Sequence, residues 1–212
     1  GTLVAISNWL KQAFGGRAPT KVLMLGLDGA GKTSFLQRLR RADAPPGPLS
    51  GWSSPIDALP PVTPTIGHDV ARVLHHEREL TIYDLGGQRQ RRPQWNRYLF
   101  ARGGPAQDDS SDQGVGGIVF VVDAADERRF DEAATELRAL LAEPRLRATP
   151  FLLVANKADL SGARSADELV ARLHVRPAEL AADGAPQLRV ISSSVVSGEG
   201  VNGALEWMAG LA

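Results

Sequence analysis

The stretch Gly26-Leu27-Asp28-Gly29-Ala30-Gly31-Lys32-Thr33 decides the fold of this 212-residue chain. It has the form GxxxxGK followed by Thr. An apolar, strand-like run, KVLMLGL at 21–27, leads into it, and a helix-like segment follows from Ser34 to Arg41. Glycines in such a loop let successive backbone N–H groups turn toward phosphate oxygens, and the following helix adds its positive dipole end. The pattern therefore predicts an α/β protein with a nucleoside triphosphate site, rather than an incidental glycine-rich turn.

The residue types of this loop predict individual roles. Lys32 would place a positive charge beside the β and γ phosphates, and the Thr33 hydroxyl would ligate a Mg²⁺ ion that bridges them. The residues of the loop that we expect to contact the phosphates are Asp28, Gly29, Ala30, Gly31, Lys32, Thr33 and Ser34.

Length and composition narrow the class of protein. The chain is long enough for one domain with a self-sustaining core. It has no cysteine, which excludes disulfides and thiolate metal sites. Lys and Arg together number 24, as do Asp and Glu, and no apolar run is long enough to span a membrane. We expect a monomer that binds no nucleic acid.

A β-hairpin is expected after the first helix. His68–His75 and Leu80–Asp84 have strand character, and residues 76–79 would join them. Neighbouring residues of a strand point to opposite faces. We therefore expect the adjacent His75 and His76 to face away from each other, which argues against a shared metal site.

The segment Asp84-Leu85-Gly86-Gly87-Gln88 ends this hairpin and has the features of a second motif that contacts the phosphates and their Mg²⁺ ion. An Asp that ends an apolar strand is typical of a carboxylate that holds Mg²⁺ directly or through water. We expect Asp84 to have this role, Gly87 to allow close approach of the backbone to the γ-phosphate, and Gln88 to orient the attacking water.

The second half of the chain alternates strands and helices. Gly117–Asp123 and Phe151–Ala155 are continuous apolar runs typical of buried parallel strands. Between them, apolar residues recur at helical spacing, and a last helix is expected over Val201–Leu211.

The strand at 151–155 leads into Asn156-Lys157-Ala158-Asp159, at the edge where α/β sheets bind ligands. The Asp159 carboxylate can accept from the N1 and N2 hydrogens of guanine, and adenine offers no such pair. Residues 194–197 follow the last predicted strand, and Ser194 and Val195 would offer backbone N–H groups to the guanine carbonyl. The site is therefore predicted to bind guanine nucleotides.

The regions outside this pattern are an amphipathic start and two loops. Thr2–Phe14 has apolar residues at helical spacing. It is open whether this helix lies on a membrane, docks on the domain itself or switches between the two. We divide the chain into an N-terminal helix and linker, 1–16, and one domain, 17–212, with exposed insertions near 42–62 and 101–116.

These motifs together resemble those of small GTPases of the Arf and Arf-like family within the Ras superfamily. The residues that carry the resemblance are Gly26–Thr33, Pro64–Gly67, Asp84–Gln88, Arg92-Pro93, Trp95, Tyr98, Phe120–Asp123, Asn156–Asp159, Ser197–Gly200 and Trp207.

The resemblance implies a P-loop fold with a six-stranded, mostly parallel sheet flanked by helices, a GTP or GDP site with Mg²⁺, and two switch segments. Thr65 would meet Mg²⁺ and the γ-phosphate in the first switch, and the second would begin at Gly87. The implied metal ligands are Thr33, Thr65 and Asp84, and the implied catalytic residues are Gln88, Lys32 and Thr65.

The resemblance also implies a cycle in which the hairpin changes register on GTP binding and expels the N-terminal helix to a membrane. Hydrolysis would be slow, because no arginine finger is identifiable in the chain. The implied partners are an exchange factor, a GTPase-activating protein, effectors and a membrane surface. The implied location is cytoplasmic, with peripheral membrane association in the GTP state, and the implied process is vesicle or membrane trafficking.

The chain departs from the family pattern at two positions. His68 stands where the family usually has the Phe of an aromatic effector patch, to which Tyr83 and Tyr98 also belong. Val195 stands where a small Ala normally lies against the guanine. Gln88 favours the switch, while Val195 and the two insertions leave a second hypothesis open, a scaffold that holds GTP or GDP with negligible turnover. Asn156–Asp159 argues against an ATP-dependent P-loop kinase.

Overall fold

The computed structural model describes residues 19–42, 67–76, 78–100, 114–175 and 187–211. The predicted N-terminal helix, Thr65 and most of both predicted insertions lie outside these residues. In the second insertion the described chain begins at Gly114, and the Gly116 N–H donates to the Lys21 carbonyl at 2.8 Å. No helix within the described ranges has both the length and the apolar character that crossing a membrane requires.

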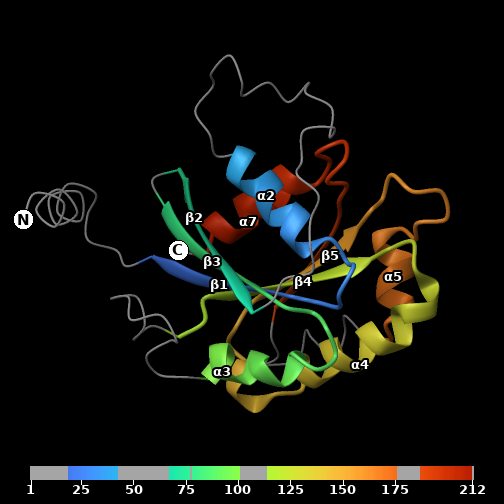
Figure 1. Ribbon diagram of the computed structural model, residues 1–212, viewed down its shortest axis with the longest axis horizontal. Helices are drawn as coiled ribbons and strands as arrows, with labels where there is room; N and C mark the ends of the chain where they lie inside the picture. The colour runs from blue at the N-terminus through green and yellow to red at the C-terminus, as the bar shows by residue number, and fades with distance from the viewer. Residues whose placement is uncertain (1–18, 43–66, 77, 101–113, 176–186, 212) are drawn as a thin grey trace, which may run out of the picture.

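Six strands form one mixed sheet in the described part of the chain (Figure 1). The order across it is β2-β3-β1-β4-β5-β6; only β2 runs antiparallel to its neighbour, and the other pairings are parallel. This confirms the expected six-stranded, mostly parallel sheet. The strands are β1 Thr20–Leu25, β2 His68–His75, β3 Arg78–Leu85, β4 Gly117–Asp123, β5 Phe151–Asn156 and β6 Leu188–Ser192.

Helices cover both faces of the sheet (Figure 1). One face packs against α2, Lys32–Ala42, and α7, Val201–Ala209. The other packs against α3, Trp95–Phe100, α4, Phe130–Leu141, and α5, Ala166–Arg172. Short 3₁₀ turns precede α3 and α4, at Arg92–Gln94 and Glu127–Arg129, and a third, Pro144–Leu146, precedes β5.

The apolar strands are buried from both sides because each face of the sheet has its own core. In β4, Ile118 and Phe120 pack with α4, while Val119 and Val121 pack with α2 and α7. The period of two that a strand imposes thus sends alternate residues into different cores. This explains why β1, β4 and β5 are apolar at nearly every position instead of alternating with polar residues.

The β2–β3 connection is tighter than the sequence suggested. Arg78 and Glu79 belong to β3, and Arg78 pairs with His75, so the strands extend further toward the connection than expected. His76 has left the strand and takes a left-handed backbone conformation with φ of 47°. The prediction that His75 and His76 face opposite sides is wrong, because the alternation rule ends where the strand ends.

Candidate functional site

The phosphate-binding loop is fixed from behind by Asn156, at the end of β5. Its side chain is fully buried, and its Nδ2 donates to the Ala30 carbonyl at 2.8 Å. Gly31 has φ of 90°, and a Cβ at that position would overlap the Asn156 amide. A glycine is therefore required here both by the left-handed backbone and by the close contact.

Lys32 begins α2 and turns back across the loop. Its Nζ donates to the carbonyl oxygens of Gly26 at 3.0 Å and Leu27 at 2.7 Å. Burial lowers the pKa of Lys32 to about 8, although the negative charges of Asp84 and Asp28 act in the opposite direction. A nearly buried ammonium with a depressed pKa gains strongly from an added anion, which suits the predicted role beside phosphates.

Thr33 and Asp84 bring two oxygen donors together. The Thr33 hydroxyl donates to Asp84 Oδ2 at 2.5 Å, and Asp84 is fully buried at the end of β3. A hydroxyl and a carboxylate are hard oxygen ligands of the kind that Mg²⁺ prefers. The residues present therefore fit the Mg²⁺ ion that the sequence predicted, and Thr65 lies outside the described residues.

The segment after β3 packs directly on the phosphate-binding loop. A Cβ at Gly87 would overlap the backbone of residues 26–28, so this position leaves no space for a side chain. The next residue, Gln88, accepts a hydrogen bond at its Oε1 from Arg91 Nε at 3.0 Å. Gln88 is thus held within its own segment in this structure.

Two arginines that the sequence analysis assigned no role hold the site together. The buried Arg92 donates to the Gly87 carbonyl at 2.8 Å and pairs with Glu132 at 2.7 Å and Glu136 at 3.0 Å. The hydrogen bond from Arg92 is the main cause that lowers the pKa of the Glu132 carboxyl. Arg92 therefore fastens the Gly87 backbone to α4.

Arg129, just before α4, contacts the loop itself. It donates to the Asp28 carbonyl at 2.7 Å and to Asp28 Oδ1 at 2.8 Å. Arg92 carries part of the resemblance to the family, so a signal for it existed. No pattern in the sequence points to Arg129, because its contact depends on how α4 is set against the loop.

The groups predicted to read the base are linked through one hydroxyl. Ser194 Oγ donates to Asp159 Oδ1 at 2.5 Å and accepts from the N–H groups of Val196 and Ser197, each at 3.1 Å. The Ser194 N–H donates to the Glu199 carbonyl at 3.1 Å. Within residues 194–197, which the structure describes, the Val195 N–H is the one backbone donor without a partner. Of the two N–H groups expected to contact a guanine carbonyl, the one of Val195 is therefore available.

Lys157 lies between the two ends of the site. Its backbone is left-handed, with φ of 64°, and its Nζ pairs with Asp123 Oδ2 at 2.7 Å. A cavity of about 220 Å³ lies beside the phosphate-binding loop and is lined by Asp28, Gly29, Ala30, Asp123 and Lys157, among others. Lys157 thus lines this cavity together with residues of the phosphate-binding loop.

The structure brings all the predicted site residues that it describes to one edge of the sheet. This edge holds the loops that follow β1, β3, β5 and β6. Their roles in binding and catalysis stay predictions. The residues are Asp28, Gly29, Ala30, Gly31, Lys32, Thr33, Ser34, Asp84, Gly87, Gln88, Asn156, Lys157, Asp159, Ser194 and Val195.

Comparison with known proteins gives consistent matches over nearly the whole chain. The family model described as "ADP-ribosylation factor family" matches residues 6–211. ADP-ribosylation factor-like protein 3 of Caenorhabditis elegans is 33% identical over 190 residues, covering 89% of this chain and 85% of that protein. The protein of the same name from Chlamydomonas reinhardtii is 31% identical over 211 residues, covering 97% of this chain and 96% of that protein.

A solved structure has a similar fold. The Arl6 BBS3 small GTPase of Trypanosoma brucei, solved with the nucleotide analogue GppNp bound, superposes with a TM-score of 0.67 at 26% identity. The match covers 90% of this chain and 95% of that chain.

Proposed function

Because the chain belongs to the ADP-ribosylation factor family, whose members are small GTP hydrolases, we propose that it is a guanine-nucleotide-dependent molecular switch. It binds GTP or GDP with Mg²⁺, hydrolyses GTP slowly and converts its nucleotide state into affinity for effectors and a membrane, in vesicle or membrane trafficking.

The observation that carries this proposal is the convergence of two recognition units on one sheet edge. Asp159, held by Ser194, offers a carboxylate to guanine, and the loop at 26–33 offers backbone N–H groups and Lys32 to phosphates. Asn156 joins the two units through its bond to Ala30. One nucleotide with a guanine base and a phosphate chain suits both units at once.

In the proposed reaction, Gln88 orients a water molecule for attack on the γ-phosphorus. The new P–O bond forms as the bond to the bridging oxygen of GDP breaks, which leaves GDP and inorganic phosphate. Lys32 stabilises the charge that develops on the phosphate oxygens. A Mg²⁺ ion held by Thr33 and Asp84, and by Thr65 as the resemblance implies, would supply further charge neutralisation.

One contact in the structure supports slow intrinsic turnover. Gln88 Oε1 accepts from Arg91 Nε at 3.0 Å, so this oxygen is already engaged by another side chain. Lys32 donates two of its three N–H groups to loop carbonyls and keeps the third for a phosphate. We therefore propose that an activating protein supplies the missing catalytic group, and an exchange factor promotes release of GDP.

The proposed effector surface includes His68 with its aromatic neighbours. Its Nδ1 lies 2.8 Å from the Tyr98 hydroxyl, and the ring centroids of Tyr83 and Tyr98 are 6.2 Å apart. His68 replaces an apolar family residue with a polar one at the exposed position of this group. We propose that the effectors of this chain differ accordingly, and that the protein is cytoplasmic and reaches the membrane through its N-terminal segment in the GTP state.

The first test is the identity of the nucleotide released when the purified protein is denatured, followed by competition among GTP, GDP and ATP. We expect close to one GDP or GTP per chain and no competition from ATP. A preparation that holds no guanine nucleotide and prefers ATP would overturn the proposal.

The bond between Gln88 and Arg91 favours one second candidate, a scaffold that holds guanine nucleotide with negligible turnover. Multiple-turnover release of phosphate separates it from the switch. A switch should release phosphate at a rate on the order of 10⁻⁴ per second. Gln88→Leu should lower this rate at least tenfold, and Gln90→Leu, at a nearby exposed position, should not. Wild-type protein that is as slow as Gln88→Leu would support the scaffold.

A further inference from the structure

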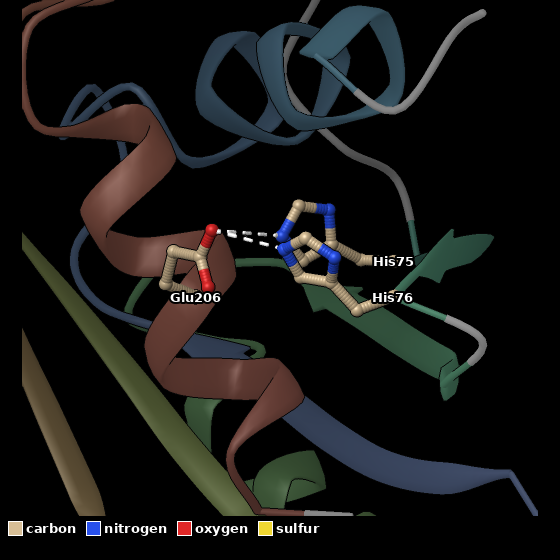
Figure 2. Close-up of side chains that lie close together, drawn as sticks. All are labelled: His75, His76 and Glu206. Atoms are coloured by element: carbon tan, nitrogen blue, oxygen red, sulfur yellow. Dashed lines mark hydrogen bonds and ion pairs between the residues drawn. The ribbon is translucent and has the colours of Figure 1, made fainter.

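His75, His76 and Glu206 form a cluster that the nucleotide site does not use. The two histidines lie at the end of β2 and in the turn after it, and Glu206 lies on α7 (Figure 2). Figure 2 shows both imidazoles pointing toward the one carboxylate. The turn joins the N-terminal end of β3, while the nucleotide site is at its C-terminal end. The six steps along the strand from Arg78 to Asp84 span about 20 Å at roughly 3.3 Å each.

The spacing of the ligand atoms is close to that of a tetrahedral metal site. Nε2 of His75 lies 3.3 Å from Glu206 Oε1, and Nε2 of His76 lies 3.2 Å from the same oxygen. Ligands that bind Zn²⁺ at about 2.0–2.1 Å in a tetrahedron are about 3.3–3.4 Å apart. All three ligand atoms lie within 4.8 Å of one another. A small rotation of the imidazoles therefore brings the two Nε2 atoms to the separation that one ion requires.

The chemistry of the three donors selects the kind of ion. Two neutral imidazoles and one carboxylate give a net charge of −1, which complements a divalent cation. Imidazole is a ligand for Zn²⁺ and similar transition ions, whereas Mg²⁺ and Ca²⁺ take oxygen ligands. Two hydrogen bonds, the stronger from His76 and the other from His75, hold the pKa of Glu206 below its ordinary value, so the carboxylate is charged at neutral pH.

The site is open to ions from solution. Side-chain exposure is 70% for His76 and 59% for Glu206, while His75 is more enclosed at 19%. The left-handed backbone of His76 is the feature that turns its ring to the side of His75. The ring centroids are 4.1 Å apart, near enough for both Nε2 atoms to bind one ion.

We propose that His75, His76 and Glu206 bind one Zn²⁺-class divalent ion that ties the β2–β3 turn to α7. The ion takes the place of the hydrogens between the two Nε2 atoms and Oε1. The proton that leaves each Nε2 is replaced by one at Nδ1, exchanged through solvent, so each imidazole stays neutral. A water molecule completes the fourth position. The tie joins residues about 130 positions apart in the chain.

The test uses full-length protein without a histidine tag, loaded with GDP in excess Mg²⁺, so that the oxygen ligands at Asp84 are saturated. Zn²⁺ is titrated in, and the ring nitrogens of the four histidines are followed by NMR. We expect one Zn²⁺ per chain, with metal-bound Nε2 shifts at His75 and His76 and none at His68 or His174. Zn²⁺ should also raise the melting temperature.

Matched variants decide between a metal site and ordinary hydrogen bonds. His75→Gln, His76→Gln and Glu206→Gln should each weaken Zn²⁺ binding at least tenfold and remove the gain in melting temperature. His174→Gln, at an exposed position after α5, should change neither. Equal binding by all four variants, or no ring shift at His75 and His76 with Zn²⁺ in tenfold excess, would overturn the proposal.

Discussion

The base end and the phosphate end of the candidate site hold their key groups in different ways. At the base end, Ser194 orients the Asp159 carboxylate, and two backbone N–H groups orient Ser194 in turn. At the phosphate end, Lys32 and Gln88 are bonded to groups of the site itself, the carbonyls of Gly26 and Leu27 and the side chain of Arg91. The base end is held by a hydroxyl that two backbone N–H groups fix, and the phosphate end by bonds to two loop carbonyls and one arginine side chain.

This difference bears on where specificity and switching arise. A prearranged carboxylate loses little freedom when a base binds, so its hydrogen bonds contribute mostly to affinity and selectivity. Groups that lie beside the phosphates make different contacts when the number of phosphates changes, which makes them sensitive to the nucleotide state. We expect the base end to set which nucleotide binds, and the phosphate end to register its state.

The largest effect that we predict is at the base end. Asp159→Asn removes the acceptor of the two guanine hydrogens and places an amide donor there instead. Affinity for GDP should fall at least 100-fold, which is about 2.7 kcal/mol, with little change for ATP. Equilibrium competition against a fluorescent nucleotide measures this. Asp167→Asn, at an exposed position of α5, is the control. If Asp159→Asn still prefers GDP over ATP as strongly as the wild type does, the role assigned to Asp159 is wrong.

An intermediate effect is expected at the residue that joins the two ends. Asn156→Ala deletes the bond to the Ala30 carbonyl and leaves that buried acceptor unpaired. The free energy of unfolding should decrease by about 1–3 kcal/mol. Urea unfolding of the nucleotide-free protein measures this free energy, because in the absence of nucleotide a change in ligand affinity does not contribute to the measured stability. Asn96→Ala, on the exposed side of α3, should be nearly neutral, and equal stability of the two variants would show that the ends are not coupled.

The smallest effect that we predict is the uptake of a proton by Lys32 when GDP binds. Burial lowers the pKa of Lys32 to about 8, and bound phosphates should raise it again. Near pH 8, binding of GDP should therefore take up about half a proton, and affinity should fall about fivefold between pH 8 and pH 9. Calorimetry in buffers of different ionisation enthalpy measures the uptake. It should vanish in Lys32→Arg, whose side chain keeps its proton, and wild-type binding without uptake would contradict the assignment.

The same pKa fixes the pH dependence of the unliganded fold. The unfolded chain keeps the Lys32 proton up to about pH 10.5, while the folded chain releases it near pH 8. Between these values the unfolded state binds more protons, so the contribution of Lys32 to stability rises with pH.

Much of the fold was predictable because its signals are local. The loop at 26–33 lies between a strand and a helix that can be read from adjacent residues, and β4 and β5 are apolar runs that only a sheet covered on both faces accommodates. The bounds of the hairpin were less accurate, since pairing of Arg78 with His75 is decided across two strands. The sheet was thus predictable in its number of strands and its mostly parallel character, and less so at the ends of its strands.

The sequence motifs of the candidate site were predictable, and the hydrogen bonds that hold these motifs in place were not. Asp159 and Lys32 belong to short motifs with a known chemistry, so their types and spacing were sufficient. The bonds from Arg129 to Asp28 and from Ser194 to Asp159 join segments that are far apart in the chain. The convergence of His75 and His76 on Glu206 depends on one left-handed residue at a turn. Such contacts follow from tertiary packing, which no local pattern records.

The bond from Asn156 to Ala30 also has a consequence for how long a nucleotide stays bound. Asn156 directly precedes the base-reading segment, yet its amide holds the loop that surrounds the phosphates. Displacement of that loop would pull on Asn156 and disturb the position of Asp159, three residues later. A partner protein that displaces only the loop around the phosphates would then shorten the lifetime of the bound nucleotide, without contacting the base.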